Sequence, residues 1–227
     1  MHWKELQEKI TEFAQGDEGL REDRIYSQAL AQLRWDKGGQ AISDNLEICR
    51  DFLDKKGGQT DKKKVEQVWL ETVEPLADCV EEVHLERHGM LKAEDKKEFG
   101  VGCAGQAIQR MYDELTSVIG PTNASRLLHL RFPKLFVMTD ERIRGYWVEE
   151  VRLHELFGLE KTELFGGYGY TFVFLPYIKS HAVDAIMTYA NDKDVTPNQA
   201  IEQLQNLSGK RQTIARVMSE YYYAITR

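Results

Sequence analysis

One stretch of the chain, residues 120–144, gathers residue types that can hold a phosphate group and stabilise positive charge. It reads GPTNASRLLHLRFPKLFVMTDERIR, and arginines lie on both sides of Asp140. An ionised carboxylate can stabilise a cation that develops in a reaction, or orient a water molecule. Arginine binds phosphate through charge-assisted hydrogen bonds. The stretch therefore combines residues for phosphate binding with a carboxylate that could stabilise positive charge, and a single site could use both.

The elements that must position these residues begin with a tight turn at Gly120-Pro121. Glycine accepts the positive φ that such a turn often requires, and Thr122 or Asn123 can cap the helix that follows. The start of that helix presents backbone N–H groups and a positive dipole end, which suit a phosphate. The residues that we predict to lie near a bound phosphate follow this turn and helix, and one follows Asp140: Gly120, Thr122, Asn123, Ser125, Arg126, His129 and Arg144.

A short apolar crossing carries the chain from this hairpin to Asp140. Pro133 ends the hairpin helix, and the run KLFVMT, residues 134–139, is the only good strand candidate in the sequence. Thr139 is predicted to be the N-cap of the next helix, with Asp140 in or beside its first turn. The dipole of that helix favours negative charge at its start.

The order of helix, glycine-containing hairpin, helix, apolar crossing and aspartate resembles that of the helix-hairpin-helix DNA glycosylases. Their hairpin reads L-P-G-V-G-x-K-T-A and their catalytic stretch reads V-D-T-H-V-x-R, and the counterparts here are VIGPTNASRLL and VMTDERIR. The stretch also resembles a group of bacterial proteins of unassigned function. About 30 of the 227 residues carry the likeness. It implies a helix-hairpin-helix element near residues 106–131, with Asp140 as the catalytic carboxylate and Arg144 near the place of the basic residue that follows it.

The departures from the family pattern narrow the activity that the resemblance implies. Bifunctional members use a lysine in the second hairpin helix, where this chain reads TNASR, and the four iron–sulfur cysteines of some relatives are absent. The second hairpin glycine is also replaced. The resemblance thus implies a monofunctional, water-using glycosylase that acts on double-stranded DNA without a cofactor. Such an enzyme flips a base out of the stack, and aromatic side chains could then stack on it: Trp147, Tyr168 and Tyr170.

A second interpretation comes from the charge of the chain and the ordinary role of an aspartate at a helix start. Aspartate is a common capping residue in its own right. The protein carries a net charge of −7, with 17 Lys and Arg against 25 Asp and Glu in residues 1–119. Nucleic-acid affinity depends largely on phosphate contacts, so an acidic protein repels DNA outside its basic stretch. The alternative is a non-catalytic helical protein that retains the fold and binds nucleic acid weakly or another protein.

The apolar pattern predicts an all-α protein with roughly eight to ten helices. Helical spacing recurs along most of the chain, as in Trp3, Leu6, Ile10 and Phe13, and no segment alternates over several strands. With 42% hydrophobic residues the chain can bury a real core. We predict a single mainly helical domain over residues 1–227, with two lobes as an alternative, and a Gly/Tyr-rich loop at GGYGY, residues 166–170.

Composition argues against several other classes of protein. Mean hydropathy is −0.51 and no apolar run approaches the roughly 20 residues of a membrane span, so no membrane partner is expected. Three widely spaced cysteines argue against a disulfide framework or a zinc ribbon and favour a reducing, cytoplasmic setting. His84 and His88 have a spacing that can suit a metal, but a solvated helix face explains it better and no metal is predicted.

Overall fold

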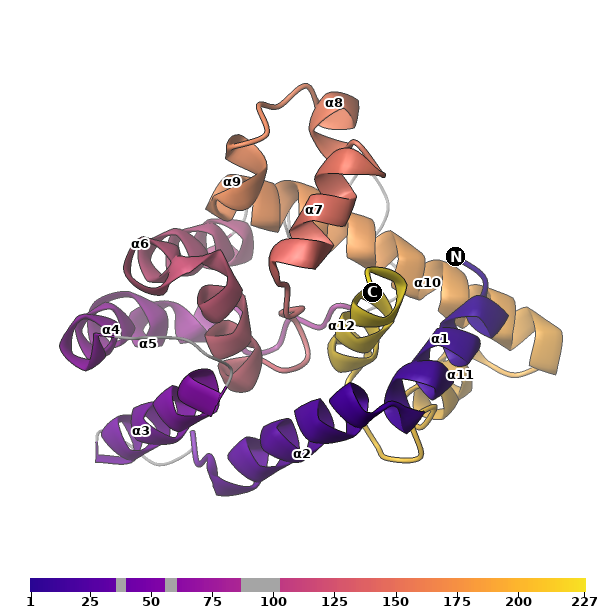
Figure 1. The fold of residues 1–227 in the computed structure, drawn as a ribbon, viewed down its shortest axis with the longest axis horizontal. Helices are drawn as coiled ribbons and strands as arrows, with labels where there is room; N and C mark the ends of the chain where they lie inside the picture. Colours follow the sequence, from indigo (N-terminus) through magenta and orange to yellow (C-terminus); the bar gives the residue numbers. More distant parts are fainter. Residues whose placement is uncertain (36–39, 56–60, 87–102) are drawn as a thin grey trace.

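The computed structural model describes residues 1–35, 40–55, 61–86 and 103–227. Within these ranges all regular structure is helical, which confirms the all-α prediction (Figure 1). The described residues form ten α-helices when the single turns α5 and α9 are counted with the helices they extend, at the upper end of the predicted number. None of the described helices has the length and apolar composition needed to cross a membrane.

The first half of the chain forms five helices and an irregular helical segment. Pro75 lies in that segment, where a π-helical turn and a 3-10 turn follow one another, and this irregular winding accommodates the missing N–H of proline. The elements are α1 (Trp3–Gln15), α2 (Asp17–Gln32), α3 (Gln40–Lys55), α4 (Lys62–Val68), the π-turn Trp69–Val73, α5 (Glu74–Leu76), the 3-10 turn Ala77–Cys79 and the long helix α6 (Cys103–Arg131).

The second half starts with two short helices and continues with α10, which has 19 residues, followed by two shorter helices. The predicted helix start at Thr196-Pro197 is confirmed, because Thr196 and Gln199 form a reciprocal capping box. The elements are α7 (Glu141–Glu149), α8 (Leu153–Phe157), the 3-10 turn Glu163–Phe165, α9 (Gly167–Gly169), the π-turn Tyr170–Phe174, α10 (Leu175–Lys193), α11 (Pro197–Leu204) and α12 (Ile214–Ile225).

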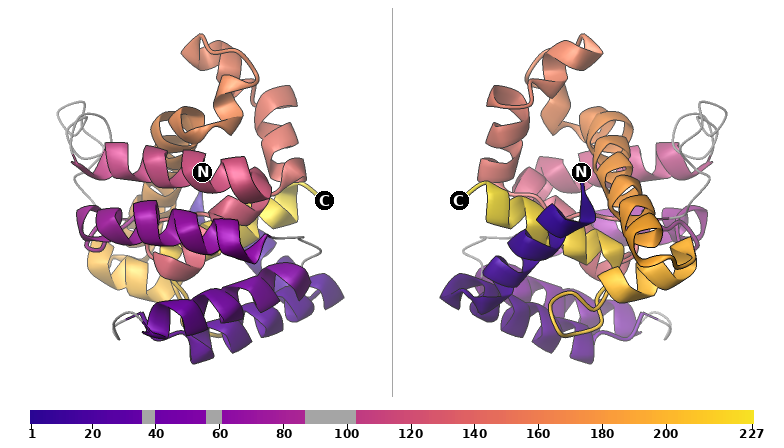
Figure 2. Two further views of the ribbon diagram at one scale, coloured as in Figure 1. Left: turned by 90° about the vertical axis from the view of Figure 1, so that its left-hand side faces the viewer. Right: turned by 90° about the vertical axis from the view of Figure 1, so that its right-hand side faces the viewer.

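The two ends of the chain pack together. Helix α1 lies against α12 and α10 (Figure 1; Figure 2, right). The Trp3 indole N–H donates to Asp192 at 2.9 Å, and the Tyr221 hydroxyl donates to Glu5 at 2.6 Å. Helix α6 packs on the other side with α3, α4 and the turn that leads into α10. The buried apolar side chains of both sides form one cluster, to which α7 contributes Ile143 and Trp147 and α8 contributes Leu153. In Figure 1, α8 lies at the upper edge of the molecule.

The segment GGYGY is helical, so the predicted loop is wrong. It forms α9 and runs through the π-turn into α10. A Cβ atom on Gly167 would lie 2.4 Å from the Gln109 carbonyl oxygen, and one on Gly169 would lie 2.3 Å from the Leu164 carbonyl oxygen. The glycines therefore allow this helical turn to pack directly on neighbouring backbone. This role could not be predicted from the sequence, because the neighbouring backbone comes from other elements.

The cysteines differ in state. Cys49 is a buried free thiol, and burial raises its pKa well above the ordinary value. Cys79 takes part in a disulfide bond. The sequence argued against a framework of several disulfides and did not predict this single bond.

Candidate functional site

The predicted hairpin turn is present at Gly120, in the middle of α6. Its backbone is non-helical, with φ 75° and ψ 162°, and a Cβ atom there would meet open space. The capping prediction for the next two polar residues is not met by their side chains. Thr122 accepts a hydrogen bond from Arg144, and the Asn123 amide donates to the Ile119 carbonyl at 3.2 Å. All three residues, Gly120 included, are half-buried.

Two of the predicted phosphate contacts, Ser125 and His129, are fully buried. The Ser125 hydroxyl accepts from the Thr139 amide at 3.0 Å and donates to the Thr122 carbonyl at 2.9 Å. A phosphate outside the protein cannot reach either side chain, so the structure corrects both assignments. Both lie on the inner face of the hairpin helix, together with the predicted core residues Ala124, Leu127 and Leu128.

The hydrogen bonds of His129 settle its tautomer. Nδ1 lies against the Phe136 carbonyl oxygen, which can only accept, so Nδ1 carries the proton. Nε2 then accepts from the Tyr26 hydroxyl at 2.8 Å. Burial lowers the pKa of His129 to about 3, so the ring is neutral in the folded protein at physiological pH. Its role is to join α2, α6 and the segment that follows.

That segment, residues 132–140, is hereafter the crossing. Its predicted strand is absent, because no neighbouring strand pairs with it among the described residues. Side-chain hydroxyls bind its backbone instead. The Val137 amide donates to the Tyr170 hydroxyl at 3.1 Å, and the same hydroxyl donates to the Val137 carbonyl at 2.7 Å. The Met138 amide donates to Ser219 at 3.0 Å. Buried backbone groups need such partners, and here three elements supply them.

Asp140 is the N-cap of α7, one residue later than the predicted cap Thr139, which is buried. Oδ1 accepts from the Ile143 amide at 2.9 Å. Oδ2 is 3.3 Å from Nη2 of Arg142, whose side chain is 47% exposed and also lies near Glu18. The Asp140 side chain is 15% exposed. One carboxylate oxygen thus fixes the helix start, and the other is paired with an exposed surface arginine.

Arg144 links the hairpin to α7. Its Nη2 donates to Thr122 Oγ1 at 2.9 Å, and the side chain lies 6.0 Å from the centre of the Phe165 ring. The residue is 9% exposed, and its Nη1 has no hydrogen-bond partner within the described part of the protein. Burial lowers the pKa of Arg144, partly offset by the nearby carboxylates of Asp140 and Glu141. The arginine is therefore positioned by the protein with one donor unused.

A depression of about 420 Å³ lies beside this arginine. Pro121 of the hairpin forms one side of it, and Lys161 and Phe165 form another. Lys161 and Phe165 were missed by the sequence reasoning, because they come from the segment after α8, which carries no motif. Arg126 is half-buried and makes no ion pair within the described ranges. Two carboxylates, Glu141 and Glu149, complete the lining of the depression, and Lys161 is paired with Glu149 at 3.0 Å. The unpaired cations of this region are thus Arg126 on the hairpin and the buried Arg144 beside the depression.

The predicted base pocket does not form from the three aromatic residues. Trp147 is fully buried, with Phe174 and Tyr222 ring centres 4.4 Å and 5.1 Å away. Tyr170 is fully buried and stacks on Tyr112 at 4.1 Å. Neither ring has a free face for a base, so the structure corrects both assignments. Tyr168 is 50% exposed and remains available.

His88, the second histidine of the metal alternative, lies outside the described residues. Within the described ranges no group of three His, Cys, Asp or Glu side chains is arranged to hold a metal ion. Comparison of the chain with protein-family models, curated proteins and solved structures found no match.

Proposed function

We propose that the protein binds DNA through the hairpin and the start of α7, and that Asp140 serves in a monofunctional, glycosylase-type hydrolysis. The observation that carries the proposal is Arg144. One of its guanidinium nitrogens holds Thr122 of the hairpin, and the other is buried without a partner beside Pro121. A DNA phosphate at the depression would supply the missing acceptor. Asp140 lies four residues before this arginine, on the same helix start.

The chemistry that we propose for Asp140 uses Oδ2, because Oδ1 is occupied by the helix cap. Water adds to the sugar C1′ atom while the bond from C1′ to the base nitrogen breaks, and the base leaves with the electron pair. The sugar carries positive charge as this bond breaks, and an adjacent carboxylate stabilises that charge. Oδ2 can also accept the proton that the water gives up, once the exposed Arg142 side chain moves away.

Duplex binding at several salt concentrations tests the DNA proposal. Binding through a few phosphate contacts falls steeply as salt rises. We expect Arg144→Gln to weaken binding by about tenfold or more, because a good charged contact contributes on the order of 1.5–3 kcal/mol. Lys63→Ala, an exposed lysine of α4, is the matched control and should leave binding unchanged. Absence of binding at low salt would remove the proposal.

The catalytic part is tested with duplexes that carry several different damaged bases. Asp140→Asn is the informative variant, because asparagine is also a good N-cap and preserves the start of α7. We expect base release by the wild-type protein and its loss in Asp140→Asn, with circular dichroism showing equal helix content. Equal base release by the two proteins would contradict the role of Asp140.

A non-catalytic DNA-binding protein is the second candidate, and two observations favour it. Both oxygens of Asp140 have partners, and the rings of Trp147 and Tyr170 are enclosed in the core. This candidate predicts salt-dependent DNA binding that Arg144→Gln weakens, without base release from any duplex. The same two experiments therefore separate the candidates.

A further inference from the structure

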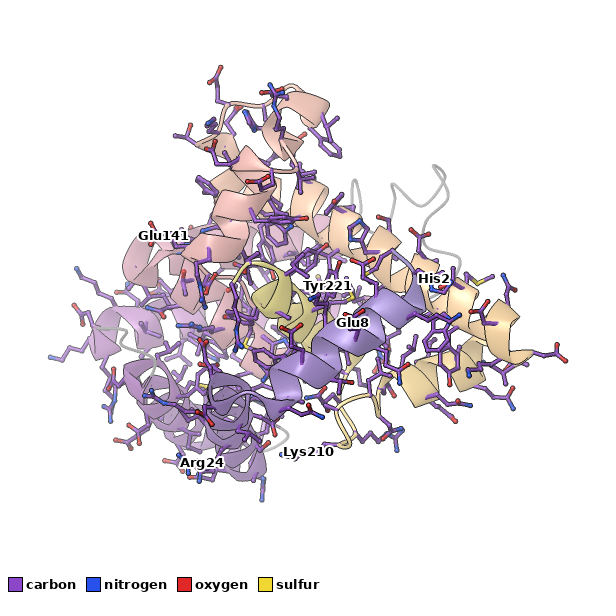
Figure 3. The ribbon with its side chains drawn as sticks, turned by 45° about the vertical axis from the view of Figure 1, so that its right-hand side comes forward. His2, Glu8, Arg24, Glu141, Lys210 and Tyr221 are labelled. Carbon is purple, nitrogen blue, oxygen red and sulfur yellow. The ribbon has the colours of Figure 1, made fainter. Side chains whose placement is uncertain are left out.

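A second polar cavity, of about 560 Å³, lies away from Asp140. It is formed by α2, the loop between α11 and α12, the first turn of α12 and the beginning of the crossing. Figure 3 places Lys210, from that loop, far from Glu141 at the start of α7. Small-molecule sites in proteins commonly have volumes of roughly 300–1,000 Å³. The size of the cavity therefore suits a small organic molecule.

Arg216 forms the inner wall of this cavity and is the strongest sign of a ligand. The residue is 1% exposed, and its guanidinium lies over the Tyr26 ring at 4.4 Å. Nε forms an ion pair with Glu220 at 3.0 Å, but Nη2 has no hydrogen-bond partner within the described residues. A buried guanidinium donor without an acceptor is unfavourable, so an acceptor that enters the cavity would be bound firmly.

Two buried acceptors of the same lining also lack partners. Gln212 donates through its amide to Glu220 at 2.7 Å, which leaves its Oε1 without a donor in the described ranges. Oε2 of Glu86 is buried and also has no hydrogen-bond donor there. The cavity thus offers a donor for an anionic group and two acceptors for hydroxyl groups.

The charges of the lining favour an anion. The lining holds four cations, Lys134, Lys210, Arg211 and Arg216, and two carboxylates, Asp23 and Glu86, for a net charge of +2, or +1 when Glu220, the buried partner of Arg216, is counted as well. Lys210 is paired with Asp23. Lys134 and Arg211 are exposed at the rim and form no ion pair within the described part of the chain. A phosphate monoester carries about −1.5 to −2 charges at neutral pH, whereas a carboxylate carries one.

We propose that this cavity binds a small phosphate monoester that carries hydroxyl groups. Arg216 receives the phosphate from inside and Lys134 and Arg211 approach it from the rim. Gln212 and Glu86 accept from the hydroxyl groups, and the Tyr26 ring and Leu30 contact the carbon skeleton. The site shares no residue with the hairpin and does not depend on the function proposed for Asp140.

Isothermal titration calorimetry with three probes tests the site: glucose 6-phosphate, ribose 5-phosphate and glycerol 3-phosphate. Inorganic phosphate and glucose serve as partial ligands, and a short DNA duplex distinguishes a nucleic-acid phosphate from a free one. We expect at least one sugar phosphate to bind tighter than inorganic phosphate, and glucose alone not to bind. Binding of the duplex at this cavity in place of all three small probes would overturn the proposal.

The variants Lys134→Ala and Arg211→Ala carry the test, because both side chains are exposed and form no ion pair in the described residues, so their loss should leave the fold intact. The double variant should bind the sugar phosphate at least tenfold more weakly, and Lys63→Ala should bind it as the wild type does. Arg216→Gln, checked for folding by circular dichroism, should abolish binding. Unchanged affinity in the double variant, or no heat of binding with any probe at millimolar concentration, would show that the assignment is wrong.

Discussion

The crossing and the polar cavity are both built from buried polar groups, but they treat those groups in opposite ways. In the crossing, the amides of Val137, Met138 and Thr139 each find a hydroxyl group from a neighbouring helix or turn. In the cavity, Nη2 of Arg216 and Oε1 of Gln212 find no partner in the described residues. Folded proteins satisfy nearly all buried polar groups, so a cluster of exceptions calls for a specific cause.

The contrast separates structural polar groups from groups kept for a ligand. The crossing has a recognisable motif order, yet most of its polar side chains serve the fold. The cavity has no motif, yet its geometry leaves donors and acceptors unused. Loss of a hydroxyl group that binds the backbone of the crossing should therefore destabilise the protein. Loss of an exposed cation at the rim of the cavity, Lys134 of the crossing included, should change stability little.

The largest effect is expected from Tyr170→Phe. It removes the hydroxyl that both accepts from the Val137 amide and donates to the Val137 carbonyl, and so leaves two buried backbone groups without a partner. The free energy of unfolding should fall by roughly 2–4 kcal/mol, measured by urea denaturation. Tyr168→Phe is the matched control on a half-exposed ring and should change it by less than about 0.5 kcal/mol. An equal loss of unfolding free energy in the two variants would contradict the structural role proposed for the hydroxyl groups that bind the crossing.

The second effect is a pH dependence set by His129. The pKa of His129 is about 3 in the folded protein, whereas an ordinary histidine, as in the unfolded chain, has a pKa of 6.5. Between these two pH values the unfolded chain therefore binds a proton that the folded protein does not bind. The contribution of His129 to the free energy of unfolding is fully present above pH 6.5. It is lost as the pH falls towards 3, by up to about 1.4 kcal/mol per pH unit. The unfolding free energy should thus be roughly 2–3 kcal/mol lower at pH 4.5 than at neutral pH from this group alone.

The variant His129→Gln isolates that contribution, because glutamine does not titrate. Its unfolding free energy should depend less steeply on pH between 6.5 and 4.5 than that of the wild type, whatever its absolute stability. The same slope in both proteins would show that His129 is charged or solvated in the folded state.

A smaller effect is expected at the hairpin turn, from Gly120→Ala. The backbone conformation at φ 75° and ψ 162° is one that essentially only glycine adopts, so alanine should cost roughly 1–3 kcal/mol. Gly145→Ala, within α7, is the control: a Cβ atom meets open space at both positions, but Gly145 has helical geometry. That substitution should be neutral or stabilise by up to about 1 kcal/mol. Similar thermal midpoints for the two variants would contradict the strained turn.

The smallest effect is expected at the rim of the cavity. Lys134→Ala and Arg211→Ala should each change the free energy of unfolding by less than about 0.5 kcal/mol, since neither exposed side chain forms an ion pair in the described residues. Urea denaturation measures this directly. A loss above 1 kcal/mol would show that these cations support the fold, and the contrast with the crossing would then disappear.

The sequence alone predicted the helical class, the turn at Gly120, the helix start at Thr196 and the inner face of the hairpin helix, because each depends on neighbours in the chain. It placed the cap of α7 one residue early. It also assigned His129, Trp147 and Tyr170 to a binding surface, since residue type does not show which face a ring presents. Their burial follows from contacts with α2, α12 and the crossing, which are distant in sequence.

The cavity could not be predicted for the same reason. Arg216, Tyr26 and Glu86 are separated by 60 residues or more between neighbours in the sequence, and each alone looks like an ordinary residue of a helix or loop. Only packing shows that these residues line one cavity, and that Nη2 of Arg216 and Oε2 of Glu86 lack hydrogen-bond partners among the described residues. The basic residues of the stretch 120–144 are recognisable in the sequence because they are adjacent in the chain. The donors and acceptors of the cavity that lack partners come together only in the folded structure.

The hydroxyl bonds of the crossing also have a consequence for solvent exchange. Amide protons outside helices and strands usually exchange quickly with water. Those of Val137, Met138 and Thr139 are buried and bound to Tyr170, Ser219 and Ser125, which come from three separate elements. Exposing them requires those elements to separate, so their exchange should require global unfolding. A non-helical segment leading to Asp140 would then be among the most slowly exchanging parts of the molecule.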